Sequence, residues 1–144
     1  MSFAILFSYA FRIFFLMGGL GAALLVPVWL LMLAGHLPTP GYLGGAAWHG
    51  HELIFGYAPA VITGFLLTAA YNWTGTPNTK GLSLVLLAGF WLAGRIVLLA
   101  ADSLPGPLVA LVDLVFLPLA GLIVLPPLWK ARKWANTAFV GLFM

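Results

Sequence analysis

The sequence predicts an all-α fold, a polytopic membrane helix bundle with four transmembrane helices plus the start of a fifth. Mean hydropathy is +1.11, and 63% of the 144 residues are hydrophobic. Charged residues make up 6% of the chain, against about 25% in soluble globular proteins. Four apolar runs reach the ~20 residues that a helix needs to cross a bilayer. A transmembrane β-barrel fits less well, because the runs do not alternate apolar and polar residues.

The four spans follow one another along the chain with short breaks between them. The first starts after Arg12 and carries no charge, while the third and fourth each enclose one charged residue, Arg95 and Asp113. Clusters of glycine, proline and asparagine, which favour turns, separate the first three runs. We expect the helices at about residues 13–35, 51–72, 81–101 and 108–129, with 137–144 beginning a fifth.

Both ends of the chain bear on the predicted domain organisation. The first run exceeds the about 7–15 apolar residues of a signal peptide core, which favours a retained helix over a cleaved leader. The last apolar residues, 138–144, are too few to span a membrane. We therefore expect a single membrane domain over 1–144 that is an N-terminal fragment. Its remaining helices would come from a longer protein or from partner subunits.

The positions of the cations predict the orientation in the membrane. Arg12, Lys80 and the cluster at Lys130, Arg132 and Lys133 flank alternate ends of the four runs, so they lie on one side. The positive-inside rule makes that side cytoplasmic, together with the N-terminus. We therefore attribute the basic pI of 9.6 to cations that set the orientation in the membrane. We expect the lipid bilayer as a partner and no nucleic acid.

The densest group of metal-binding side chains lies in the motif Trp48-His49-Gly50-His51-Glu52. His49, His51 and Glu52 are candidate metal ligands, because the chain has no cysteine and imidazole and carboxylate both bind metals. In a regular helix His49 and Glu52 share a face, whereas His49 and His51 point nearly apart. One metal on both imidazoles therefore needs a local break, which Gly50 favours. The alternative is a set of interfacial polar residues beside an aromatic-belt tryptophan.

Small residues at four-residue spacing follow this motif, at Gly56, Ala60 and Gly64. Such spacing lets a neighbouring helix approach closely, so we expect these residues to serve helix packing. Pro59 cannot donate an N–H to the helix, so the sequence also predicts a bend just below the motif.

Three charges are expected in the same half of the membrane. By the rise of an α-helix, Arg95 lies ~22 Å from Lys80 and Asp113 lies ~8 Å from the start of its own span, while Glu52 lies at a similar level. Charged groups are costly in hydrocarbon, so those that remain are functional candidates. Arg95 and Asp113 either form a structural charge pair between adjacent helices, or Arg95 binds the anionic groups of a cofactor.

Several motifs together resemble those of the NnrS family of bacterial inner-membrane proteins, and the resemblance covers most of the chain. It departs from the family at Ile13, where proline is expected, and in length, because family members are much longer. The matching residues are Phe11-Arg12 with Phe14-Phe15, Trp48-His49-Gly50-His51-Glu52 with Phe55-Gly56, Gly64-Phe65-Leu66-Leu67-Thr68-Ala69, Asn72-Trp73-Thr74-Gly75 and Trp91-Leu92-Ala93-Gly94-Arg95.

The resemblance implies a haem- and copper-binding protein that acts in nitric oxide tolerance and is not itself a nitric oxide reductase. It makes His49 and His51 the expected haem or metal ligands. Further ligands would lie in additional spans, so the cofactors are not necessarily bound by this segment alone. No catalytic residue is predicted, and a binding protein is expected rather than an enzyme.

Two other functions compete with this interpretation. Glu52, Arg95, Asp113 and the imidazoles could form a relay in a proton- or ion-coupled membrane transporter. Alternatively, the charges serve only to hold helices together in a structural membrane module. Without the resemblance, the residues alone do not separate these three functions.

Overall fold

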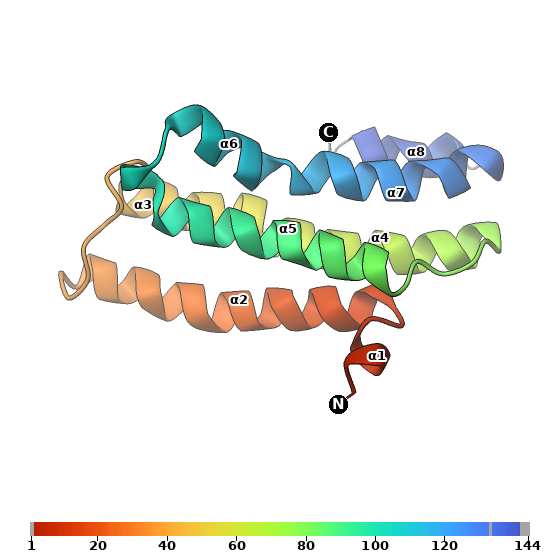
Figure 1. Cartoon of the computed structure of the whole chain (residues 1–144), viewed down its shortest axis with the longest axis horizontal. Helices are drawn as coiled ribbons and strands as arrows, with labels where there is room; N and C mark the ends of the chain where they lie inside the picture. The colour runs from red at the N-terminus through yellow and green to blue at the C-terminus, as the bar shows by residue number, and fades with distance from the viewer. Residues whose placement is uncertain (1, 133, 142–144) are drawn as a thin grey trace.

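The structure, a computed structural model, describes residues 2–132 and 134–141, apart from the side chains of 138–140. Throughout this part of the chain the regular structure is helical (Figure 1). The predicted class, an all-α membrane helix bundle, is confirmed. Four helical stretches are long and apolar enough to cross a membrane, namely Ala10–Leu33, Gly45–Thr74, Leu82–Leu99 and Gly106–Lys130.

The first span begins earlier than the sequence predicted. A short helix α1 (Phe3–Leu6) precedes α2 (Ala10–Leu33), whose start at Ala10 lies ahead of the expected residue 13. Arg12 holds this junction, because its Nη1 donates to the carbonyl of Ile5 at 3.1 Å and to Ser8 Oγ at 3.0 Å. The cation therefore caps the turn between α1 and α2.

The second span consists of three joined helices. These are α3 (Gly45–His51), a π-helical turn η1 (Glu52–Tyr57) and α4 (Ala58–Thr74). Pro59 has no N–H to give to the carbonyl four residues earlier, so the regular α-helical ladder cannot run through this point. The sequence predicted a bend below the histidine motif, and the structure has a π turn there. Such turns frequently mark functional sites.

The fourth span is broken, which the sequence did not predict. After α5 (Leu82–Leu99) and the 3₁₀ turn η2 (Ala101–Ser103) come α6 (Gly106–Leu114) and α7 (Phe116–Lys130), which meet at Val115. Pro118 gives the physical reason, because it lacks the N–H that would bond the Leu114 carbonyl and its ring crowds that carbonyl.

The last described helix is α8 (Trp134–Gly141), which packs against α7. It begins three residues before the expected position at residue 137. The end of that predicted segment, residues 142–144, lies outside the described part of the chain.

Close approach of small residues joins the spans. A Cβ added at Gly18 of α2 would lie 3.0 Å from Val61 and 3.9 Å from the Cβ of Ala60 on α4. One added at Gly64 would lie 3.0 Å from both Phe14 and Phe15. Lipid tails are as apolar as the side chains, so this close packing, rather than the hydrophobic effect, holds membrane helices together. The stripe predicted for helix packing therefore faces α2 at Ala60 and Gly64.

Candidate functional site

Four ionisable side chains form a continuous network across three spans. His51 Nε2 lies 3.0 Å from Asp113 Oδ2. The other carboxylate oxygen of Asp113 accepts from Arg95 Nη2. Arg95 Nη1 donates to Glu52 Oε2 at 3.1 Å. The network thus runs from α3 and η1 through α5 to α6, with Arg95 bridging two carboxylates.

The side chains of this network are largely buried. Glu52, Arg95 and Asp113 are 3%, 6% and 7% exposed, and the His51 side chain is 17% exposed. Removing one partner of a buried ion pair is destabilising, by about 3–5 kcal/mol, because it leaves an uncompensated charge. The four groups therefore depend on one another, and they tie the second, third and fourth spans together.

Gly56 and Trp91 line the space that the Arg95 guanidinium occupies. A Cβ added at Gly56 would overlap Arg95 Nη1 and lie 2.8 Å from Glu52 Oε2. The Gly56 carbonyl accepts from Trp91 Nε1 at 2.8 Å, and Arg95 Cζ lies 5.8 Å from the centre of the Trp91 ring. Gly56, predicted to serve helix packing, thus makes room for a charged group. Trp91 was not predicted, although its four-residue spacing from Arg95 places both on one helix face.

The two histidines of the motif contact different parts of the protein. His51 bonds Asp113 of α6, whereas the ring of His49 stacks on Trp29 of α2 at 3.8 Å and 8°. Within residues 2–132 and 134–141, no three His, Asp or Glu side chains are placed to hold one metal ion. Glu52 is bound to Arg95. The structure therefore does not bring the three predicted ligands together around one point.

Several buried polar atoms near this site have no hydrogen-bond partner among the described residues. They are His51 Nδ1, Arg95 Nε, and the indole nitrogens of Trp29 and Trp48. Buried polar atoms are nearly always paired in proteins, so each of these atoms has hydrogen-bonding capacity that the described residues do not use.

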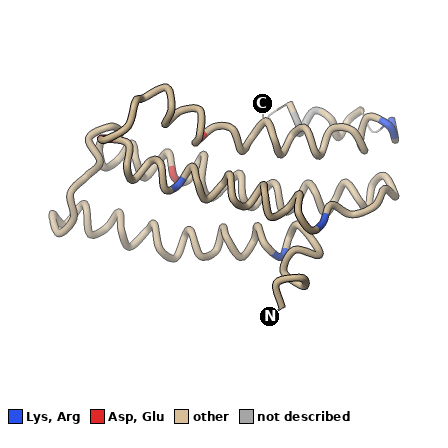
Figure 2. Tube along the Cα trace, viewed as in Figure 1, with Lys and Arg blue, Asp and Glu red and all other residues tan. Residues whose placement is uncertain are grey.

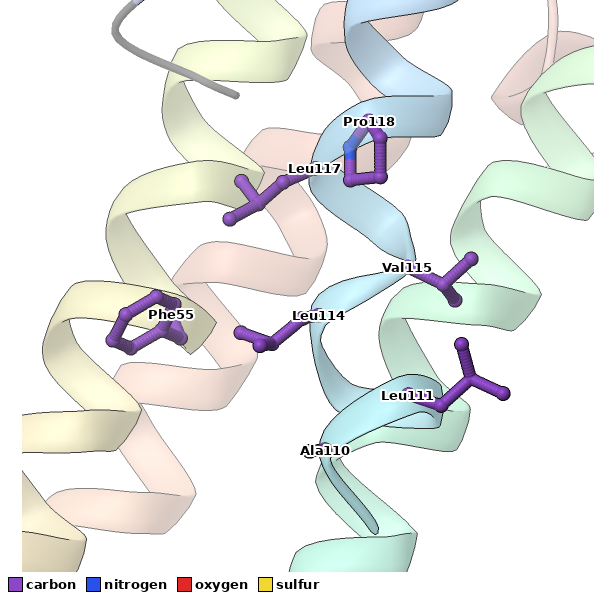
Figure 3. Close-up of a pocket in the computed structure, with 7 residues that line it drawn as sticks. All are labelled: Phe55, Ala110, Leu111, Leu114, Val115, Leu117 and Pro118. Atoms are coloured by element: carbon purple, nitrogen blue, oxygen red, sulfur yellow. The ribbon is translucent and has the colours of Figure 1, made fainter. Parts of the chain in front are cut away.

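An apolar groove lies beside the break in the fourth span. It has a volume of about 550 Å³. In Figure 3, Phe55 of η1 faces Leu114 and Leu117 across it, while Leu111 and Val115 point away from Phe55. The Phe55 ring also stacks on His51, with centroids 4.7 Å apart. Phe55 therefore separates the groove from the imidazole.

A second cavity, of about 260 Å³, reaches the network itself. His51 and Asp113 line it, together with Tyr42 and Leu43 from the loop between α2 and α3. It shares Phe55 and two residues of α6, Ala110 and Leu114, with the first groove.

Asp102, in the turn η2, fastens the loop beside this cavity. Its Oδ2 accepts from the Gly41 N–H at 2.9 Å, and its Oδ1 from the Tyr42 N–H at 2.8 Å. Its partners are backbone groups 60 and 61 residues earlier, and no spacing pattern reveals such contacts.

Charges are distributed unevenly along the bundle. Figure 2 shows Lys and Arg where α2 and α5 begin and at the far end of α7, all toward one end. In this view a blue and a red segment overlap inside the bundle toward the other end. The buried network is thus separated from the surface cations.

The comparison with protein families identifies this architecture. A family model described as NnrS protein matches residues 5–144, which include all four spans and the whole charge network. Neither the curated proteins nor the solved structures compared with this chain give a match. The chain therefore belongs to the NnrS family, and at family level it is a multi-pass membrane protein of the nitric oxide response.

Proposed function

We propose that this protein resides in the bacterial inner membrane, binds haem or copper, and serves in nitric oxide tolerance without being a nitric oxide reductase. The family match over residues 5–144 is the observation that carries the proposal. When bound, haem or copper supplies the redox-active metal, and the protein supplies the ligand and its surroundings.

His49 fits the role of a haem or copper ligand. Among the described residues its imidazole forms neither an ion pair nor a hydrogen bond, and stacking on Trp29 fixes the plane of its ring. A neutral imidazole is a good ligand for both metals. Copper requires further donors, which the described residues do not group around His49. We therefore place those donors in other helices of a longer protein or in partner subunits.

His51 and Arg95 fit less direct roles. The carboxylate of Asp113 holds one nitrogen of His51, as outer carboxylates commonly do for metal-binding imidazoles, so only Nδ1 remains for a ligand. Both terminal nitrogens of Arg95 are engaged with carboxylates. Arg95 therefore suits the structural charge pair better than the binding of haem propionates.

Absorption spectra and metal content of the intact protein test this assignment. We expect His49→Ala to lose most of the bound haem or copper, and His51→Ala to lose a smaller share. His36→Ala is the matched control, because His36 is exposed in the loop after α2 and should leave both unchanged. Full retention of haem and copper in the His49 and His51 variants would refute the proposal.

A second function, a proton- or ion-coupled transporter, is favoured by one observation. His51, Asp113, Arg95 and Glu52 form an unbroken chain of ionisable contacts across three membrane-spanning stretches, and such chains occur in proton relays. Proton or solute movement into liposomes by cofactor-free protein, abolished by Asp113→Asn, would favour this function over the first.

A further inference from the structure

The cavity beside His51 and Asp113 has no role in the cofactor proposal, whose main expected ligand is His49. On one side it is bounded by Tyr42 and Leu43, which lie in a loop outside the spans. On another side it is bounded by the polar pair of His51 and Asp113. The cavity therefore lies between the water-facing loop and the buried charge network.

The loop is fastened beside this cavity at three points. Asp102 accepts from two successive backbone N–H groups, those of Gly41 and Tyr42. The Tyr42 ring rests on the start of α6, where a Cβ added at Gly106 would lie 3.6 Å from it. Leu43 packs against the buried cluster that includes Val97 and Val109. Among these contacts only that of Asp102 is polar, and it can be removed by one substitution.

The chemistry of the lining restricts what the cavity can hold. Apart from Tyr42, His51 and Asp113, its walls are apolar side chains. The network behind it contains two carboxylates and one guanidinium, so its formal charge is −1 when His51 is counted as neutral. In a low dielectric such a charge strongly disfavours an anion. A neutral or cationic molecule that donates hydrogen bonds suits the site.

We propose that this cavity binds a small neutral or cationic solute from the aqueous phase at the loop side, and that Asp102 latches the segment Gly41–Leu43 closed over it. The two hydrogen bonds to Asp102 are charge-assisted and therefore stronger than bonds between neutral groups. Their loss frees the loop without altering any residue of the charge network. The latch controls entry of the solute, and His51 and Asp113 receive it.

Thiol labelling of the intact protein in nanodiscs tests this proposal. The sequence described here contains no cysteine, and Val109→Cys places one thiol at a buried position of the cavity wall. Two methanethiosulfonate reagents of similar size are compared, one with a trimethylammonium and one with a sulfonate group. Thr39→Cys, in the exposed part of the loop, gives the reference rate for each reagent.

With the latch intact, we expect the Val109→Cys thiol to react slowly with both reagents relative to the Thr39→Cys thiol. Adding Asp102→Ala removes both hydrogen bonds of the latch and should raise the rate of the cationic reagent by at least about tenfold, the change expected from the loss of one of them. The anionic reagent should gain much less. Asp102→Asn, which retains one carbonyl acceptor, should give an intermediate rate.

Gly41→Ala is a second test of the latch, which does not depend on whether the Asp102 variants fold. Its added Cβ would lie 3.2 Å from Asp102 Oδ1, so it should weaken the latch and speed labelling while the charge of Asp102 remains. Equal labelling rates with and without the latch would show that the segment Gly41–Leu43 does not control access to the cavity. If loss of the latch raised the rates of the two reagents equally, each taken relative to its rate at Thr39→Cys, the proposed class of solute would be wrong. Thiol labelling does not depend on bound haem or copper, so failure here is distinct from failure of the cofactor proposal.

Discussion

At the scale of single residues, Arg95 is the central member of the buried network, because it alone contacts both carboxylates. The sequence placed Glu52, Arg95 and Asp113 at a similar depth, since depth follows from counting residues along each span. It did not identify Glu52 as a partner of Arg95. That contact depends on how each helix is rotated about its axis, and the π turn at Glu52–Tyr57 alters that rotation.

Removing the charges singly and together tests the network. Arg95→Leu leaves Glu52 unpaired and Asp113 with His51 as its remaining partner, and an orphaned buried ion costs about 3–5 kcal/mol. Asp113→Leu should be milder, because Glu52 still balances Arg95. The double variant should recover part of the loss, and adding Glu52→Gln should recover more. The amount of folded protein in membranes and the thermal midpoint after purification measure this.

Leu98→Ala, at a buried position one turn from Arg95, serves as a control for loss of packing on the same helix. It should lower stability whether or not the charges are present. Strictly additive losses among Arg95, Asp113 and Glu52 variants would show that the three side chains do not act as one unit.

At the scale of elements, the positions of the spans were predictable and their internal breaks were not. Hydropathy is summed over about 20 residues, so it locates a span without reporting how its backbone bonds locally. Pro59 did signal an interruption, whereas the break at Pro118 was not predicted. Whether a proline gives a bend, a π turn or a full break depends on the neighbouring helices, which can compensate for the lost hydrogen bond.

The fit of the π turn against α5 depends on Gly56. We expect Gly56→Ala to lower stability by about 1–3 kcal/mol, the usual cost of overpacking, because its Cβ would overlap the Arg95 guanidinium. Gly89→Ala is the matched control on α5, where an added Cβ meets nothing within 4 Å. It should be neutral or slightly stabilising. Thermal melts of both variants measure this difference. Equal melting points would show that Gly56 is not closely packed against Arg95.

At the scale of the whole molecule, the segregation of surface cations predicts the orientation in the membrane. A cysteine at Thr39, in the loop after α2, should react in intact cells with a membrane-impermeant thiol reagent. One at Asn78, in the loop after α4, should react only after the membrane is opened. The reverse pattern would place the N-terminus outside and turn the charge network toward the cytoplasm.

The bridging position of Arg95 also bears on how the protein is made. Glu52 leaves the ribosome 43 residues ahead of Arg95, and Arg95 leaves 18 residues ahead of Asp113. During that interval the second span carries a carboxylate with no counter-ion, which disfavours its lateral release into lipid. We therefore expect the insertion machinery to retain this span until the third and fourth are synthesised. The three helices then enter the bilayer together, at the moment when their charges first meet.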